Sequence, residues 1–118
     1  MSEITHWING KTFDDSAKRH GEIFNPATGE VSKKLAFGTA ATVDVAVKAA
    51  TDAFAEWRHS SLTKRVNVLF AFRELVNTNK EKIAALITAE HGKVLSDAAG
   101  EVTRGLEVVE FACGIPHL

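Results

Sequence analysis

The sequence predicts an α+β chain in which short antiparallel strands come first and helices follow. Two observations favour this order. Asn9-Gly10 stands between two strand-like runs, and the spacing of apolar residues changes from two to about 3.6 near residue 40. We therefore expect a β-hairpin arm over residues 1–40 and three to four helices over residues 41–118.

The hairpin is the clearest element of the arm. Residues 5–8 and 11–13 are strand-like runs on either side of Asn9-Gly10, the dipeptide typical of a two-residue hairpin turn. Residues 14–21 are mostly polar and predict a solvated loop. Residues 22–24 then predict a short strand.

A turn and a further strand complete the arm. Residues 25–30 predict a turn, because Pro26 fixes φ and Gly29 supplies a positive φ. One side of the strand that follows carries Val31, Lys33, Leu35 and Phe37. Three of these four residues are apolar, which gives that side of the strand an apolar character.

Two helices with apolar faces follow the arm. Thr42 is placed to cap the first, whose apolar positions recur every three or four residues over about four turns. The second begins after Ser61. Its apolar residues, from Leu62 to Val76, spread well beyond one narrow stripe. This helix must therefore be covered on more than one side.

The rest of the helical region contains further helix ends. Residues 77–79 weaken or interrupt the second helix, so the region holds either three or four helices. Gly92 is placed to end the piece that follows, in the left-handed conformation. The last helix is expected over residues 94–113, before Gly114 and Pro116.

Composition limits the classes of function. The chain has 118 residues, a formal net charge of −1 at pH 7 and one cysteine. There is no basic excess for nucleic acid, no run near the roughly 18 apolar residues of a membrane span, and no signal peptide, so we expect a cytoplasmic protein. A cofactor enzyme usually needs more than one unit of about 100–150 residues, so we expect a small function or part of something larger.

Reactive patterns are scarce in this sequence. Cys113 and His117 could act as nucleophile and base, but Gly114-Ile115-Pro116 breaks the helix between them, and a core cysteine is the simpler interpretation. The histidines lack metal-ligand spacing, and no glycine-rich phosphate cradle occurs. We therefore predict no catalytic and no cofactor-binding residue in this chain.

Two charged residues stand out. Glu90 lies on the apolar side of its helix, where a buried acid needs a cation, an arginine or a backbone N–H. Arg104, whose fork suits a carboxylate, stands between Gly100 and Gly105. Each glycine costs a helix about 1 kcal/mol relative to alanine, so something packs closely there or needs the space. The other acids predict solvated helix surface: Glu101, Glu107 and Glu110.

Together these motifs resemble the start of an aldehyde dehydrogenase. They occur in the order and spacing of that family: Ile8-Asn9-Gly10, Asn25-Pro26-Ala27-Thr28-Gly29-Glu30-Val31, Asp44-Val45, Ala53-Phe54-x-x-Trp57, Arg65 and Glu90-His91-Gly92-Lys93. The run from Gly100 to Leu118 is similar to one branch, the CoA-acylating methylmalonate-semialdehyde dehydrogenases. The resemblance covers nearly the whole chain.

The resemblance implies an NAD-dependent oxidation of methylmalonate or malonate semialdehyde to an acyl-CoA. Because family members are several times longer, it also implies an N-terminal fragment. That fragment would belong to the α/β NAD-binding domain, and it would lack the Rossmann, catalytic and oligomerisation parts. NAD and CoA would serve the complete enzyme, whereas we expect neither to bind this chain alone.

The resemblance also implies roles for a few positions. Arg104 matches an arginine that grips the substrate carboxylate, and Glu90 with the backbone at Ile23 and Phe24 matches a site for a monovalent cation. Cys113 does not match the nucleophile motif of the family. The expected partners are the remainder of the dehydrogenase chain and other copies, in a homo-oligomer held through exposed apolar helix faces. The alternative is a non-enzymatic helical interaction or self-association module.

Overall fold

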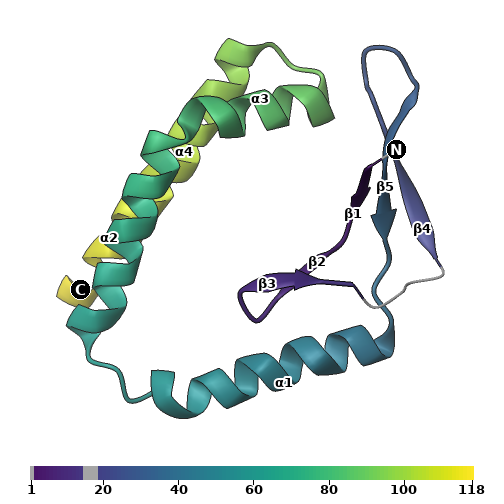
Figure 1. The fold of residues 1–118 in the computed structure, drawn as a ribbon. Coiled ribbons are helices and arrows are strands. Elements are labelled where there is room, and N and C mark those ends of the chain that lie inside the picture. The colour runs from purple at the N-terminus through teal and green to yellow at the C-terminus, as the bar shows by residue number, and fades with distance from the viewer. Residues whose placement is uncertain (1, 15–18) are drawn as a thin grey trace. The chain divides into compact units, whose positions relative to one another are not determined.

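The computed structural model describes residues 2–14 and 19–118, which form two compact units, Met1–His59 and Ser60–Leu118 (Figure 1). The first unit contains β1 (Ser2–Ile4), β2 (His6–Ile8), β3 (Lys11–Phe13), β4 (His20–Phe24), β5 (Val31–Ala36) and α1 (Ala40–Trp57). The second contains α2 (Leu62–Thr78), α3 (Lys80–His91), α4 (Leu95–Gly114) and a short 3₁₀ helix, η1 (Ile115–His117). The predicted α+β class is confirmed.

β2 and β3 form the predicted hairpin. They pair antiparallel, with His6 opposite Phe13. Asn9 and Gly10 both have positive φ, 54° and 74°, which is the pattern of a type I′ turn. This turn matches the twist of the two strands, so the local sequence is enough to specify the hairpin.

A second sheet has the strand order β1-β5-β4. β4 and β5 are antiparallel, with Glu22 opposite Lys34, whereas β1 runs parallel to β5, with Glu3 opposite Lys34. The prediction of antiparallel strands is therefore wrong for β1. Its three residues are too few to show a period, and its partner strand is distant in the sequence.

β4 begins at His20, inside the segment predicted as a loop over residues 14–21. Residues 15–18 of that segment lie outside the described part of the chain. Gly21 belongs to the strand, and the Phe37 ring lies so close to it that an added Cβ would come within 2.8 Å of a ring carbon. The loop prediction is wrong at its end because strand pairing, not local composition, decides there.

The predicted turn at residues 25–30 is present. Gly29 has a φ of 74°, and its N–H donates to the Asn25 carbonyl at 2.8 Å. The expected apolar side of β5 is only partly covered, since Leu35 is 36% and Phe37 39% exposed, whereas Ala36 on the opposite side is buried.

A reciprocal capping box starts α1, but at a different residue from the one predicted. The Thr39 hydroxyl accepts from the Thr42 N–H at 3.2 Å, and the Thr39 N–H donates to the Thr42 hydroxyl at 2.9 Å. Thr39 is therefore the N-cap, and Thr42, predicted as the cap, lies buried at the third helical position. Two threonines at this spacing satisfy each other's backbone, which favours the earlier start.

The apolar stripe of α1 is largely exposed. Val43, Val47 and Phe54 are all more than half exposed. Between these positions the helix carries alanines, which border a hollow of about 330 Å³ shared with the hairpin. The hollow is lined by Trp7, Ile8, Asn9, Ala46, Ala49, Ala50 and Ala53.

The second unit settles the number of helices as four in the described chain. Ser61 caps α2 as predicted, its hydroxyl accepting from the Lys64 N–H at 3.2 Å. Asn79 separates α2 from α3, and its side-chain amide donates to the Leu75 carbonyl at 2.9 Å. Gly92 ends α3 with a φ of 86°, as its position predicts.

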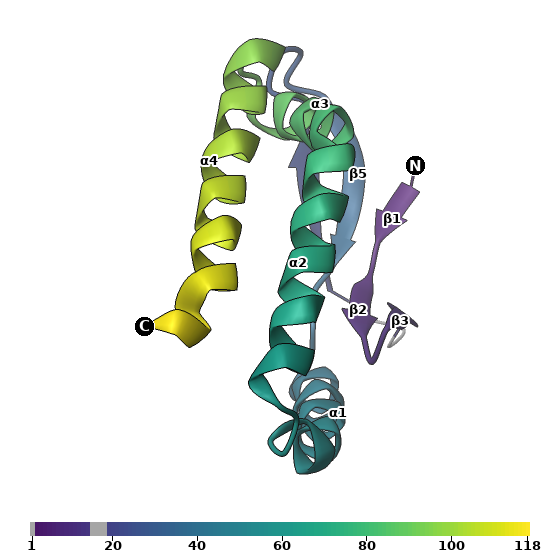
Figure 2. The same ribbon diagram turned by 90° about the vertical axis from the view of Figure 1, so that its left-hand side faces the viewer.

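α4 lies beside α2 and crosses α3 (Figure 2). It starts one residue later and ends one residue later than predicted, with Val94 as its N-cap. The core at the crossing is built from Ala84, Ala98 and Val102, surrounded by partly buried Val76, Ile83, Ile87 and Ala99. Small side chains at the centre allow the two helix backbones to approach closely.

The wide apolar surface predicted for α2 is not covered within the described residues. Val68, Phe70, Phe72 and Leu75 are each half exposed or more. Large apolar side chains left exposed in this way are typical of a helix that packs against another protein surface.

We predict that Ala84→Leu destabilises the helical unit by about 1–3 kcal/mol, because the residue is 1% exposed and a larger side chain would force α3 away from α4. Ala85→Leu, its exposed neighbour, is the matched control and should change the free energy of unfolding by less than about 0.5 kcal/mol. Urea unfolding followed by far-UV circular dichroism measures both. Equal losses would show that the crossing is not tightly packed.

Candidate functional site

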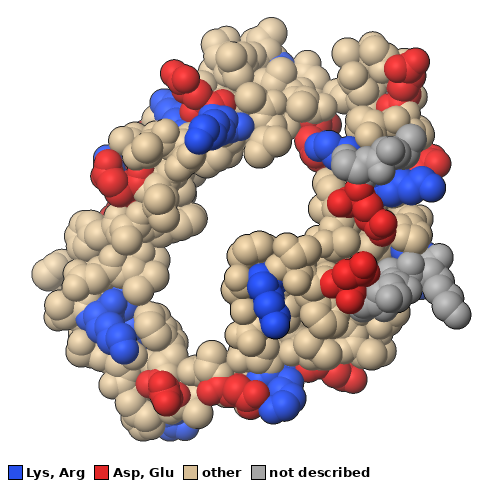
Figure 3. Space-filling model, in the orientation of Figure 1, with Lys and Arg blue, Asp and Glu red and all other residues tan. Residues whose placement is uncertain are grey.

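Figure 3 shows lysine and arginine interspersed with aspartate and glutamate, between broad uncharged areas. In the described chain, no helix is both long enough and apolar enough to cross a membrane. Within residues 2–14 and 19–118 no three His, Cys, Asp or Glu side chains are grouped to hold a metal ion.

Arg104 lies on the exposed side of α4 and forms no hydrogen bond or ion pair with the described residues. A Cβ added at Gly100, one turn earlier, would lie 3.9 Å from its Nη1, so the guanidinium extends back over that glycine. A Cβ added at Gly105 would meet nothing within 4 Å. Gly100 is therefore covered by the Arg104 side chain, whereas Gly105 borders open space, and no close packing against either glycine is present in the described part of the chain.

Glu101 lies one turn before Arg104 and is held by a lysine. Its Oε1 accepts from the Nζ of Lys93 at 2.5 Å. That hydrogen bond is the main reason why the pKa of Glu101 lies below its ordinary value. The electrostatic influence of Lys93, Arg104 and His91 lowers the pKa of Glu101 further, while partial burial opposes it. Glu101 thus keeps a partly exposed side chain, 41% exposed, and pairs with a lysine that the sequence did not indicate.

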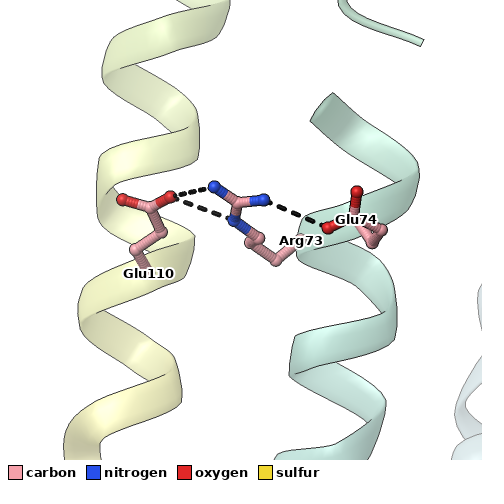
Figure 4. A network of polar contacts seen from close by, with 3 residues as sticks. All are labelled: Arg73, Glu74 and Glu110. Atoms are coloured by element: carbon pink, nitrogen blue, oxygen red, sulfur yellow. Dashed lines mark hydrogen bonds and ion pairs between the residues drawn. The ribbon is translucent and has the colours of Figure 1, made fainter. Parts of the chain in front are cut away.

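A second ion pair joins α2 to α4 (Figure 4). Arg73 donates from Nε at 3.0 Å and from Nη2 at 2.7 Å to one carboxylate oxygen of Glu110, and from Nη1 to Glu74 at 3.1 Å. The hydrogen bond to Glu110 is the leading cause of a raised pKa at Arg73. Glu110 lies on the exposed surface, as predicted, and it also links two helices. Its partner is 37 residues away, and no local pattern indicates such a contact.

Cys113 and His117, weighed as nucleophile and base, lie in different environments. Cys113 is 5% exposed at the end of α4, whereas His117 is an exposed residue of η1. The cysteine lines a hollow of about 480 Å³ between α2 and α4, together with Phe70, Arg73, Glu74 and Glu110. A buried thiol in this position behaves as a small core residue.

The proposed cation ligands lie in both units. Ile23 and Phe24 flank a bulge in β4, and the Ile23 carbonyl accepts from the Ser32 hydroxyl at 2.9 Å. Glu90 is an exposed residue near the end of α3. A monovalent cation at these residues stays a prediction.

A comparison with protein families identifies the class of this chain. The model of the aldehyde dehydrogenase family matches residues 13–117. The chain therefore belongs to the aldehyde dehydrogenase family.

Among curated proteins the chain is similar to malonate-semialdehyde dehydrogenases. It is 42% identical over all 118 residues to that of Pseudomonas aeruginosa and 44% identical to one of Listeria monocytogenes. In both comparisons the match covers 100% of this chain and 24% of the relative. The chain thus spans about a quarter of the length of the curated relatives that it matches.

Solved structures agree with this placement. A protein assigned as a methylmalonate-semialdehyde dehydrogenase, from Sinorhizobium meliloti in complex with NAD, superposes with a TM-score of 0.94 at 41% identity, over 99% of this chain and 24% of that one. An NAD-dependent benzaldehyde dehydrogenase of Corynebacterium glutamicum gives 0.87 at 26% identity, over 96% and 25%. The fold described above is therefore that of the matching quarter of these aldehyde dehydrogenases.

We predict that the Glu101 carboxyl titrates below an ordinary glutamate and that Lys93→Met returns its pKa toward the ordinary value. Because the folded-state pKa is lowered, the pair stabilises the fold at pH above the unfolded-state pKa. That contribution is lost as the pH falls through the folded-state pKa. An NMR titration of the side-chain carboxyl carbon measures the shift. Lys82→Met is the control, and an equal response to both variants would contradict the assignment.

Proposed function

We propose that this chain is the N-terminal part of an NAD-dependent, CoA-acylating dehydrogenase that oxidises malonate or methylmalonate semialdehyde. The observation that carries the proposal is the likeness over all 118 residues to proteins named malonate-semialdehyde dehydrogenase. It is supported by Arg104, an exposed guanidinium without an ion pair in the described chain.

Arg104 is the proposed substrate-binding residue. A semialdehyde of this class differs from a simple aldehyde by a carboxylate, and an arginine fork can donate two parallel hydrogen bonds to it. The Arg104 guanidinium lies over Gly100, and the open space at Gly105 leaves room beside the helix. The role of this chain in the reaction would thus be to select and hold the substrate.

The chemical steps are assigned to the rest of the enzyme. The sequence contains neither a Gly-x-Gly-x-x-Gly pattern nor a triphosphate-binding loop, and its one cysteine is buried. In the complete enzyme, a cysteine outside these residues would attack the aldehyde carbon. NAD would supply the hydride acceptor and CoA the acyl acceptor, and the carboxyl group would leave as carbon dioxide or bicarbonate. We propose that the residues for these steps lie outside this chain.

The exposed apolar faces favour a large partner surface. We propose that α1 and α2 pack against the remainder of the dehydrogenase chain, that the complete enzyme is a homo-oligomer, and that it is cytoplasmic. A structure that leaves Phe54, Phe70 and Leu75 more than half exposed supports the first of these. The same faces would also suit a non-enzymatic interaction or self-association module, which is the second candidate. A reading frame that continues with a dehydrogenase sequence would exclude it.

We predict that the complete enzyme reduces NAD when given malonate semialdehyde and CoA, whereas the 118-residue chain alone does not. The absorbance of the reduced cofactor measures turnover, and mass spectrometry identifies the acyl-CoA. Turnover by the isolated chain, retained after removal of host enzymes, would contradict the assignment of the chemical steps. A complete enzyme that ignores the semialdehyde would contradict the proposed function.

We predict that Arg104→Leu in the complete enzyme lowers kcat/KM for the carboxylated semialdehyde by roughly ten-fold to a hundred-fold, the value of a charge-assisted bidentate pair. Propanal, which has no carboxylate, should be affected little. Arg58→Leu is the matched control, since it removes an exposed arginine from the other unit. An equal loss for both substrates would make Arg104 a structural residue.

A further inference from the structure

Two cations lie near one carboxylate on α4. Glu101 accepts a hydrogen bond from Lys93, and it also lies one turn from Arg104, whose charge acts on it. On a helix, side chains three residues apart are neighbours, and an acid and an arginine at this spacing form an ion pair readily. Yet in this structure the Glu101 carboxylate accepts its hydrogen bond from Lys93, and the Arg104 guanidinium has no hydrogen-bonded partner among the described residues.

Lys93 is placed for this contact by the turn between α3 and α4. Gly92 adopts the left-handed conformation, with a φ of 86°, and its N–H donates to the Thr88 carbonyl at 2.9 Å. The chain then turns through Lys93 and Val94 into α4. The Lys93 side chain is only 18% exposed, so it has less freedom than an ordinary surface lysine. The turn thus brings its ammonium to a residue eight positions further on.

We propose that Lys93 is a positioning residue that holds the Glu101 carboxylate so that the Arg104 guanidinium stays available for the carboxylate of the substrate. This inference rests on the proposed function, in which Arg104 binds that carboxylate. Without Lys93, Glu101 is left with Arg104 as the cation within reach on its own helix. An internal carboxylate would then compete with the substrate for the same fork.

The competition predicts a selective defect in the complete enzyme. Lys93→Met should raise KM for malonate semialdehyde by roughly three-fold to ten-fold. This range lies between the strength of an ion pair on an exposed helix surface and that of an ion pair shielded from water. The kcat value and the kinetics with propanal should hardly change. Lys93→Arg, in contrast to Lys93→Met, should keep a KM close to wild type, because it keeps a cation for Glu101. Lys82→Met, which removes a lysine from α3, is the matched control.

The double variant Lys93→Met with Glu101→Gln is the decisive test. It removes the competing carboxylate together with its holder, so KM for the semialdehyde should return close to wild type. Glu101→Gln alone should leave KM nearly unchanged, because Arg104 is already available. Lys93→Met could also lose activity toward both substrates. The double variant then tests the cause, because its activity recovers only if the freed Glu101 carboxylate is responsible for the loss.

Three results would overturn the proposal. One is an unchanged KM in Lys93→Met, and another is a double variant as impaired as Lys93→Met. The third is a Glu101→Gln enzyme whose KM falls by the same factor by which KM rises in Lys93→Met. Equal and opposite changes would indicate a long-range effect of net charge and not competition for Arg104. Arg104→Leu, measured alongside, separates the two levels of the argument. If Arg104→Leu selectively lowers kcat/KM for the semialdehyde while the Lys93 variants leave KM unchanged, only this inference is overturned. If Arg104→Leu shows no such selectivity, the assignment of Arg104 to the substrate carboxylate is overturned as well.

Discussion

The close approach of α3 and α4 is the constraint on which the helical unit depends. It is possible because Ala84 and Ala98, which are 1% and 0% exposed, put almost no side chain between the two backbones. With the helices this near, the connection is short, and it needs the left-handed Gly92 to reverse the chain. That reversal brings Lys93 to Glu101. A packing requirement in the core thus fixes a charge arrangement on the surface.

The same small core explains why so much apolar surface remains outside. Three residues of modest size form its centre, and no large side chain in the described chain is fully buried. Several long side chains of α2 remain outside this core, with Phe70 and Leu75 more than half exposed. Burying them would stabilise the fold by about 25 cal/mol for each Å² of apolar area removed from water. A fold that leaves this gain unused is well suited to pack against more protein.

Local signals predicted the elements whose cause is local. Asn9-Gly10 is sufficient for a type I′ turn, and Gly92 for a helix end, because both depend on backbone conformation alone. Contacts between distant residues were not predictable in this way, which is why β1 and the Arg73–Glu110 pair were missed. In the candidate site, the glycines beside Arg104 singled it out. The contact of Lys93 with Glu101, beside Arg104, depends on how the turn places the lysine, and the spacing of residues in the sequence does not predict that placement.

The value of an arginine without a hydrogen-bonded partner depends on its surroundings. On the exposed side of α4, water solvates the Arg104 guanidinium, and no protein partner is needed. If the remainder of a dehydrogenase covers this helix, the group loses water and must gain an anion to offset the cost. Were that anion Glu101, the charge would be satisfied internally and the site would have no preference for a carboxylated substrate. Because Lys93 already holds Glu101, the anion that pairs with Arg104 must come from a ligand. A substrate carboxylate is the anion that the proposed reaction supplies.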